Sequence, residues 1–155
     1  MKKNNKGFTL VEIVIAVAIL AILIGIAVPA LLGNVNKSKI ATDKSNAATI
    51  GQTAMLVITE ADGSTVYKNV DKTLTAVATN PTSGSFEEAF VNKLGNAADI
   101  KPKVSGYTDF QLVVSDITSD SADVKVYAVK GSDKVQLWPE VAATANYGKK
   151  TSESK

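Results

Sequence analysis

The stretch Gly7-Phe8-Thr9-Leu10-Val11-Glu12 opens an apolar run of 25 residues, from Phe8 to Leu32, in which Glu12 is the only charged residue. A run of this length can cross a bilayer as a helix, which needs ~20 apolar residues. An ionised carboxylate is costly in hydrocarbon, so intramembrane carboxylates are usually paired and functional. Glu12 therefore needs a partner of opposite charge, and the identity of that partner points to the function.

The segment before the apolar run carries three Lys, at positions 2, 3 and 6. The excess of positive charge places residues 1–7 on the cytoplasmic side of a membrane. A secretory signal peptide would be cut after Ala18 or Ala30, which makes its apolar region too short or too long. A plain membrane anchor explains neither Glu12 nor the junction between Gly7 and Phe8.

A Lys-rich segment ending in Gly7, followed by Phe-Thr-Leu-Val-Glu and about 20 apolar residues, resembles the leader of type IV pilins and pseudopilins. The resemblance implies that residues 1–7 are a leader and that a prepilin peptidase cuts between Gly7 and Phe8. It also implies N-methylation of Phe8, and it places Glu12 at the fifth mature position, where the family carries a Glu. At residue level the resemblance covers about Lys6–Leu32, and beyond that it is architectural.

Cleavage would create the missing partner of Glu12. The new α-amino group of Phe8 has a pKa of ~8 and is therefore positive at pH 7. If the helices stack in parallel with an axial offset, Glu12 of one subunit can neutralise Phe8 of a neighbour and so fix the register of assembly. An alternative role for Glu12 is a favourable interaction with the helix dipole at the N-terminus.

Gly25 and Pro29 interrupt an otherwise good helix-forming sequence. Pro29 lacks an N–H, so the carbonyl of Gly25 loses its helical partner, and the two residues weaken the same turn. We expect a mild kink in the monomer and local melting of the helix in a filament. Pro29 matches the proline that the resembled family has at this depth.

Residues 33–62 form the amphipathic continuation of the helix, which we expect to run from Phe8 to about Ala61 and to end before Asp62-Gly63. Its expected apolar stripe contains Val35, Ile40, Ala47, Ala48, Ile50, Gly51, Ala54, Met55 and Ile58. Its expected polar face contains Lys37, Lys39, Asp43, Lys44 and Gln52.

Residues 63–106 form a loop region, in which Ser64–Asp71 could hold a short strand. A short helix over residues 86–94 follows from a capping box at Ser85 and Glu88 and from Gly95 after its last residue. The carboxylates Glu87 and Glu88 are accounted for by this helix N-terminus rather than by acid–base catalysis.

Residues 107–140 alternate between apolar and polar side chains in three runs, which predicts an antiparallel β-meander packed on Ile50–Ile58. Trp138 is expected to cover the core or the sheet edge rather than to bind a ligand. Residues 141–155 form the C-terminal tail, in which Gly148–Lys155 is polar and expected to be disordered. Without a Cys, packing alone must hold the sheet edge and the tail after Tyr147. The fold class is α+β: a long N-terminal helix packed against a sheet of three to four strands.

The composition excludes several kinds of site, because the sequence contains no His, Cys or Arg. Imidazole and thiolate metal sites, Ser-His-Asp triads and disulfides cannot form. No catalytic residue, cofactor or metal site is predicted, and Asp116–Asp123 reads as a solvated turn, with a calcium site as the alternative. Without residues 1–7 the chain has 14 Lys and 15 acidic residues, which disfavours nonspecific nucleic-acid binding.

The leading hypothesis is a structural, non-enzymatic pilin subunit. It would be a single-pass membrane protein before assembly and then part of a homopolymeric filament on the bacterial surface, for adhesion or motility. The resemblance implies a prepilin peptidase, an assembly ATPase and an inner-membrane platform as partners. The alternatives are a pseudopilin of a type II secretion or DNA-uptake system and, from another class, a membrane-anchored extracellular binding module.

Overall fold

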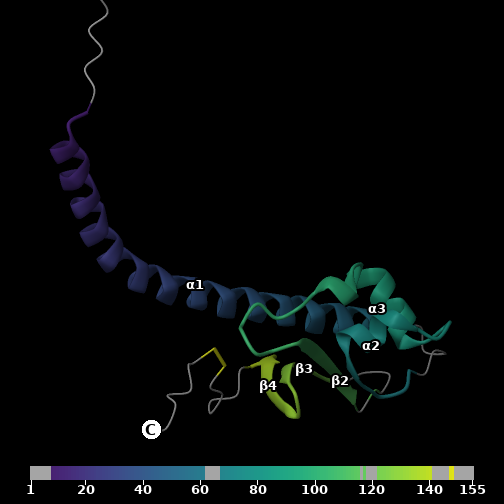
Figure 1. Cartoon of the computed structure of the whole chain (residues 1–155). Helices are drawn as coiled ribbons and strands as arrows, with labels where there is room; N and C mark the ends of the chain where they lie inside the picture. The colour runs from purple at the N-terminus through teal and green to yellow at the C-terminus, as the bar shows by residue number, and fades with distance from the viewer. Residues whose placement is uncertain (1–7, 62–66, 116, 118–121, 141–146, 149–155) are drawn as a thin grey trace, which may run out of the picture. The chain divides into compact units, whose positions relative to one another are not determined.

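The computed structural model describes residues 8–61, 67–115, 117, 122–140 and 147–148, which fall into two compact units, Met1–Lys37 and Ser38–Lys155. Helix α1, Leu10–Glu60, belongs to both units and is α-helical without interruption (Figure 1). Its ends lie within two residues of the expected Phe8 and Ala61.

In the second unit, one stripe of α1 is buried. Its members recur at intervals of three and four residues, as one face of a helix requires. They are Asp43, Ala47, Ile50, Gly51, Ala54 and Val57. Two expectations are corrected here: Asp43 belongs to the buried stripe and not to the polar face, whereas Met55 is 45% exposed. The difference arises because the buried face is centred one position away from the face that the largest apolar residues indicate.

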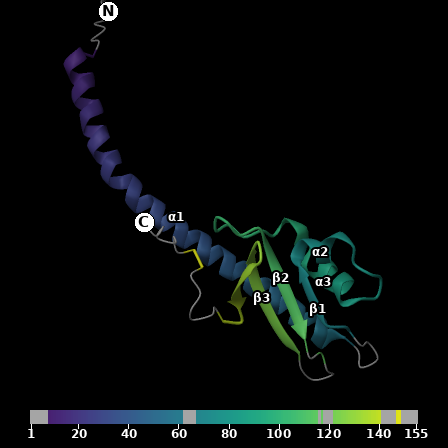
Figure 2. The same cartoon turned by 60° about the horizontal axis from the view of Figure 1, so that its bottom comes forward.

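The sheet is a four-stranded antiparallel meander whose strands follow one another in chain order (Figure 2). Its strands are β1 Val70–Thr73, β2 Asp109–Ser115, β3 Asp123–Lys130 and β4 Asp133–Trp138. The last two strands are joined at Gly131, whose positive φ of 59° suits a tight hairpin turn. The long helix followed by this sheet confirms the predicted α+β fold class.

Strand β1 begins at Val70, near the end of the Ser64–Asp71 segment in which a short strand was expected, and extends past it to Thr73; residues 64–66 of that segment lie outside the described part. The strand pairs with β2, with Val70 opposite Val114 and Thr73 opposite Gln111. The fourth strand therefore comes from the region read as irregular, because Val70 is buried against the core and pairing supplies the backbone hydrogen bonds.

Three short helical segments connect β1 to β2: α2 Leu74–Thr79, α3 Phe86–Leu94 and η1 Ala97–Asp99. Helix α3 has the expected range, and the Ser85 hydroxyl accepts a hydrogen bond from the Glu88 N–H at 3.3 Å. The Glu88 carboxylate turns back to the Gly84 N–H, at 2.7 Å, so both caps of the N-terminus are made. Helix α2 was not predicted; its buried Leu74 and Val77 show why it forms, since six residues alone would not.

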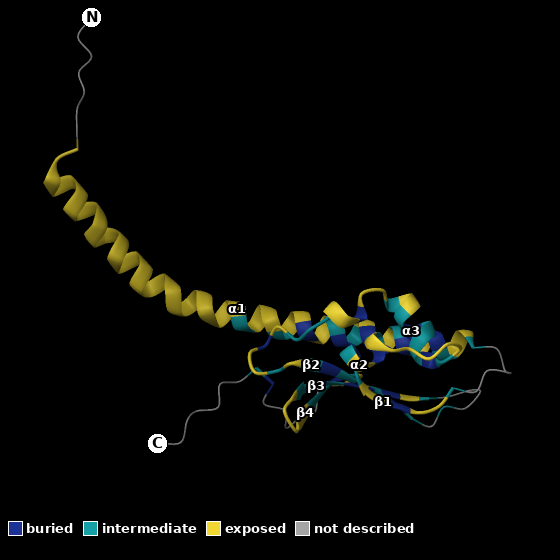
Figure 3. Cartoon of the chain, turned by 45° about the vertical axis from the view of Figure 1, so that its right-hand side comes forward, coloured by how far each residue is buried: buried dark blue, intermediate teal, exposed yellow. Residues whose placement is uncertain are grey.

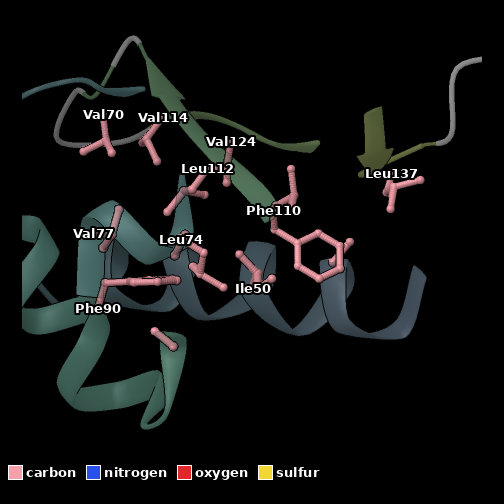
Figure 4. Close-up of a cluster of buried hydrophobic side chains, with 14 of the residues drawn as sticks. Ile50, Val70, Leu74, Val77, Phe90, Phe110, Leu112, Val114, Val124 and Leu137 are labelled. Carbon is pink, nitrogen blue, oxygen red and sulfur yellow. The ribbon is translucent and has the colours of Figure 1, made fainter. Parts of the chain in front are cut away.

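The core lies between the helices and one face of the sheet, as Figures 3 and 4 show for the second unit. Alternate residues of β2 point into it, so that Phe110, Leu112 and Val114 are fully buried. Ile50 of α1 and Phe90 of α3 close it from the helical side. Trp138 lies at the edge of this core, as expected, with its ring directly against the backbone of Gly51.

Candidate functional site

The first unit presents an apolar helix with no covering partner among the described residues. Its large side chains are exposed along all faces, with Phe8 84% and Ile26 73% accessible, and the helix is yellow throughout this part in Figure 3. An 18-residue window of α1 is long and apolar enough to cross a membrane, and none of that window is buried. A helix that is hydrophobic all round must be buried in lipid or in other helices.

Glu12 lies in the first turn of α1 and is held there by Thr9. Its Oε2 atom accepts hydrogen bonds from the Thr9 N–H and from the Thr9 hydroxyl, both at 2.8 Å. In return, the Glu12 N–H donates to Thr9 Oγ1 at 3.3 Å. This reciprocal capping box satisfies donors that the first turn of a helix otherwise leaves unpaired.

The capping box has two consequences for the site. All its bonds lie within residues 9–12, so a cut between Gly7 and Phe8 would leave it intact. Both bonds to the carboxylate end on Oε2, so these contacts leave Oε1 open to a further donor. The sequence contains the Thr-x-x-Glu signature of a capping box at residues 9–12. Of the two roles predicted for Glu12, the interaction with the helix dipole is the one closer to this geometry.

The remaining residues of the predicted site are distributed along the same helix. Phe8 precedes α1 by two residues, whereas Gly7 lies outside the described residues. Gly25 and Pro29 lie inside α1, where the helix continues without a break, and a Cβ at Gly25 would meet nothing within 4 Å. Cleavage, methylation, pairing of Glu12 and melting near Pro29 stay predictions, because each concerns a processed or assembled state.

Asp43 is a functional candidate that the sequence reasoning missed. Its side chain is fully buried, unlike the other acidic side chains among the described residues. A usable signal was present, because Ala47, Ile50 and Ala54 follow it at i+4, i+7 and i+11 on one helical face. Its carboxylate binds the backbone of a distant loop and Tyr147, as set out below.

The described residues contain no group of three acidic, His or Cys side chains that could hold a metal ion. The predicted turn at Asp116–Asp123 lies mostly outside these residues. Its last member, Asp123, is described and forms an ion pair with Lys125.

Comparison with known proteins gives two matches. The family model for the prokaryotic N-terminal methylation motif matches residues 2–28. The type II secretion system core protein G of Vibrio cholerae serotype O1 is 40% identical over 87 residues, which cover 54% of this chain and 56% of that protein. The chain thus spans about half the length of this relative. No solved structure matches the chain.

Proposed function

We propose that the chain is a member of the type IV pilin and pseudopilin family, a structural subunit that polymerises through α1 into a filament. The observation that carries this proposal is the lone Glu12 at the start of an exposed, membrane-length apolar helix, within the matched methylation motif. Such a helix needs lipid before assembly and helices of other subunits after it.

The first step is processing at the membrane. A prepilin peptidase removes residues 1–7 and N-methylates Phe8, which leaves a cationic amine at the end of the apolar segment. The three Lys of residues 1–7 keep the leader on the cytoplasmic side, where the peptidase acts. Until assembly the chain is anchored by a single helix, and an assembly ATPase with its membrane platform supplies the work of extraction.

The second step is docking of the subunit at the filament base. The Phe8 amine of one subunit pairs with Glu12 of its neighbour, so each relieves the desolvation cost of the other. Thr9 holds the carboxylate by one oxygen and leaves Oε1 to the incoming amine. The weak turn at Gly25 and Pro29 then lets the helix stretch as subunits pack.

The chain could be one of two kinds of filament subunit, a type IV pilin or a pseudopilin, and a specific observation favours each. A Lys-rich leader that ends in Gly7, followed by Glu12 as the lone charge of the apolar run, is typical of a subunit that builds the body of a type IV pilus for adhesion or motility. The 40% identity to a type II secretion core protein favours a pseudopilin, which builds a short filament in a secretion or DNA-uptake machine.

Immunogold imaging of sheared surface filaments, with an antibody against residues 107–140, separates the two candidates. Labelling along the whole length of long filaments supports the pilus subunit. Absence from long filaments, together with loss of protein secretion or DNA uptake in a deletion strain, supports the pseudopilin. Recovery of the protein only as a monomer in the membrane, in strains with intact assembly machinery, would overturn both.

A further inference from the structure

The buried carboxylate of Asp43 joins three segments of the second unit that are far apart in the sequence. Its Oδ1 accepts a hydrogen bond from the Lys103 N–H at 2.7 Å, and its Oδ2 accepts one from the Val104 N–H at 2.9 Å. The Tyr147 hydroxyl also donates to Oδ2, at 2.6 Å. Three donors thus satisfy both oxygens of a fully buried carboxylate.

The contacts around this carboxylate fix the C-terminal residues on α1. Tyr147 is 5% exposed, and its ring lies 4.6 Å from that of Tyr107, centroid to centroid. The next residue, Gly148, has a φ of 72° and lies so close to Ile40 that a Cβ would overlap the Ile40 side chain. The chain therefore needs glycine here for its backbone conformation and for the close approach to the helix.

The hydroxyl of Tyr147 is a donor at every physiological pH. Burial raises the pKa of Tyr147 well above its ordinary value of 10.0, and the hydrogen bond to Asp43 and its negative charge raise it further. The Tyr147 hydroxyl therefore keeps its proton at neutral pH and can donate it to Asp43.

We propose that Asp43, the Lys103–Val104 backbone and Tyr147 form a non-covalent clasp that locks Tyr147 and Gly148 onto α1. The sequence has no Cys, so no disulfide can do this. The clasp acts as a conformational device: when it opens, the loop and the C-terminal residues are released together while the sheet stays folded. The expectation that packing alone holds the tail after Tyr147 concerns residues that, apart from Gly148, lie outside the described part of the chain.

The geometry explains why the clasp is all-or-none. If an amide replaces the Asp43 carboxylate, one of its two acceptor oxygens becomes an NH2 group that faces protein donors, and at least one donor is left without an acceptor, which is unfavourable unless water replaces the lost oxygen. Water enters only if the segment carrying the donors moves away from α1. The Lys103–Val104 backbone and Tyr147 are therefore released from α1 together, although Val104 and Tyr147 lie 43 positions apart in the sequence.

Native-state proteolysis of the full chain in detergent micelles tests the clasp. Trypsin cleaves after Lys103 and chymotrypsin after residue 147, while cleavage after Lys125, within β3, reports unfolding of the sheet. Cleavage rates follow the population of the open form when opening is fast. We expect Asp43→Asn to raise cleavage at both clasp sites by about tenfold or more, with cleavage after Lys125 unchanged.

Tyr147→Phe is the second variant, because it keeps the ring and the chymotrypsin site but removes the donor. We expect cleavage after residue 147 and after Lys103 to rise together, by a smaller factor than in Asp43→Asn, because both backbone bonds to Asp43 remain. Tyr127→Phe, on the other side of the sheet, is the matched control and should change neither rate. Wild-type rates at both sites in Tyr147→Phe and in a folded Asp43→Asn would overturn the proposal, as would equal acceleration at all three sites.

If Asp43→Asn does not fold, Tyr147→Phe alone decides. Faster cleavage after both residue 147 and Lys103, with cleavage after Lys125 unchanged, then supports the clasp, whereas wild-type cleavage at both sites, or faster cleavage after residue 147 alone, overturns it. The clasp does not depend on assembly, so its failure would leave the proposed filament function intact, and failure of assembly would leave the clasp intact.

Discussion

Replacement of Glu12 by Gln removes the negative charge at the start of α1 but keeps the size and shape of the side chain. Gln has nearly the same volume and still offers a carbonyl oxygen to the two donors of Thr9, which lie 2.8 Å from the native carboxylate. Charge-assisted hydrogen bonds are roughly twice as strong as neutral ones, and a helix N-terminus favours an anion by ~0.3–1 kcal/mol. Because Glu12 is fully exposed in the monomer, we therefore expect the helix cap there to weaken only slightly.

In a filament the loss would be larger, because the amine of Phe8 would be buried without a counter-ion. Breaking a buried charge pair by removal of one partner costs ~3–5 kcal/mol. At about 1.4 kcal/mol per factor of ten, each subunit addition would be weakened by roughly 10²- to 4 × 10³-fold. Filaments should therefore be nearly absent, while the processed protein accumulates in the membrane.

The assay is an immunoblot of sheared surface filaments and of the membrane fraction, with leader removal verified by mass for each variant. Thr9→Val is the matched control, since it breaks the capping box but keeps the charge, and it should reduce assembly far less than Glu12→Gln. Wild-type filament levels in Glu12→Gln would refute the charge-pairing argument. Equal loss in both variants would show that the cap, and not the charge, is what assembly requires.

Three further predictions concern the second unit, each checked by chemical denaturation followed by circular dichroism. Gly51→Ala should destabilise the second unit by about 1–2 kcal/mol, because overlap of the new Cβ with the Trp138 ring outweighs the gain of ~1 kcal/mol in helix propensity. An increase in the stability of this variant would mean that the ring moves away freely. Ser85→Ala should cost ~0.5–2 kcal/mol through loss of the α3 cap, and an unchanged midpoint would contradict the capping geometry. Burial acts to raise the pKa of Glu87, but hydrogen bonds, above all from Lys72, and the Lys72 charge hold it below its usual 4.5. This stabilisation is present above about pH 4.5 and is lost as the pH falls through the folded-state pKa of Glu87. Lys72→Met should therefore lower the free energy of unfolding by at most ~0.5 kcal/mol at pH 7 and should not change it at pH 2. An equal loss at both pH values would exclude the ion pair as the source of the effect.

Local signals predicted those elements whose packing follows a simple period. Alternation marked the buried side of β2 and β3, and the Ser85 capping box with Gly95 located both ends of α3. Helix α2 has no such signal, because Thr75, Val77 and Thr79 are poor helix formers whose conformation depends on contacts with the rest of the core. Strand β1 was weakly marked for the same reason, since only pairing with β2 defines it.

The residues of the candidate site also differ in how far the sequence alone reveals their roles. The position of Glu12 in an apolar run could be read from the sequence alone, because a charge in hydrocarbon needs an explanation. The role of Asp43 could not, since its donors come from residues 60 and more positions away and its neighbours Lys39 and Lys44 make the region look solvated. Long-range hydrogen bonds leave no periodic trace in a sequence.

The central claim is that a cut after Gly7 creates the charge that Glu12 binds. Mass spectrometry of the N-terminal peptide, from the protein in assembled filaments, tests this most directly. We predict a peptide that begins at Phe8 with an N-methylated, otherwise free amine. A start at Met1, Ile19 or Leu31, or a blocked amine at Phe8, would contradict the account, because Glu12 would then have no such partner.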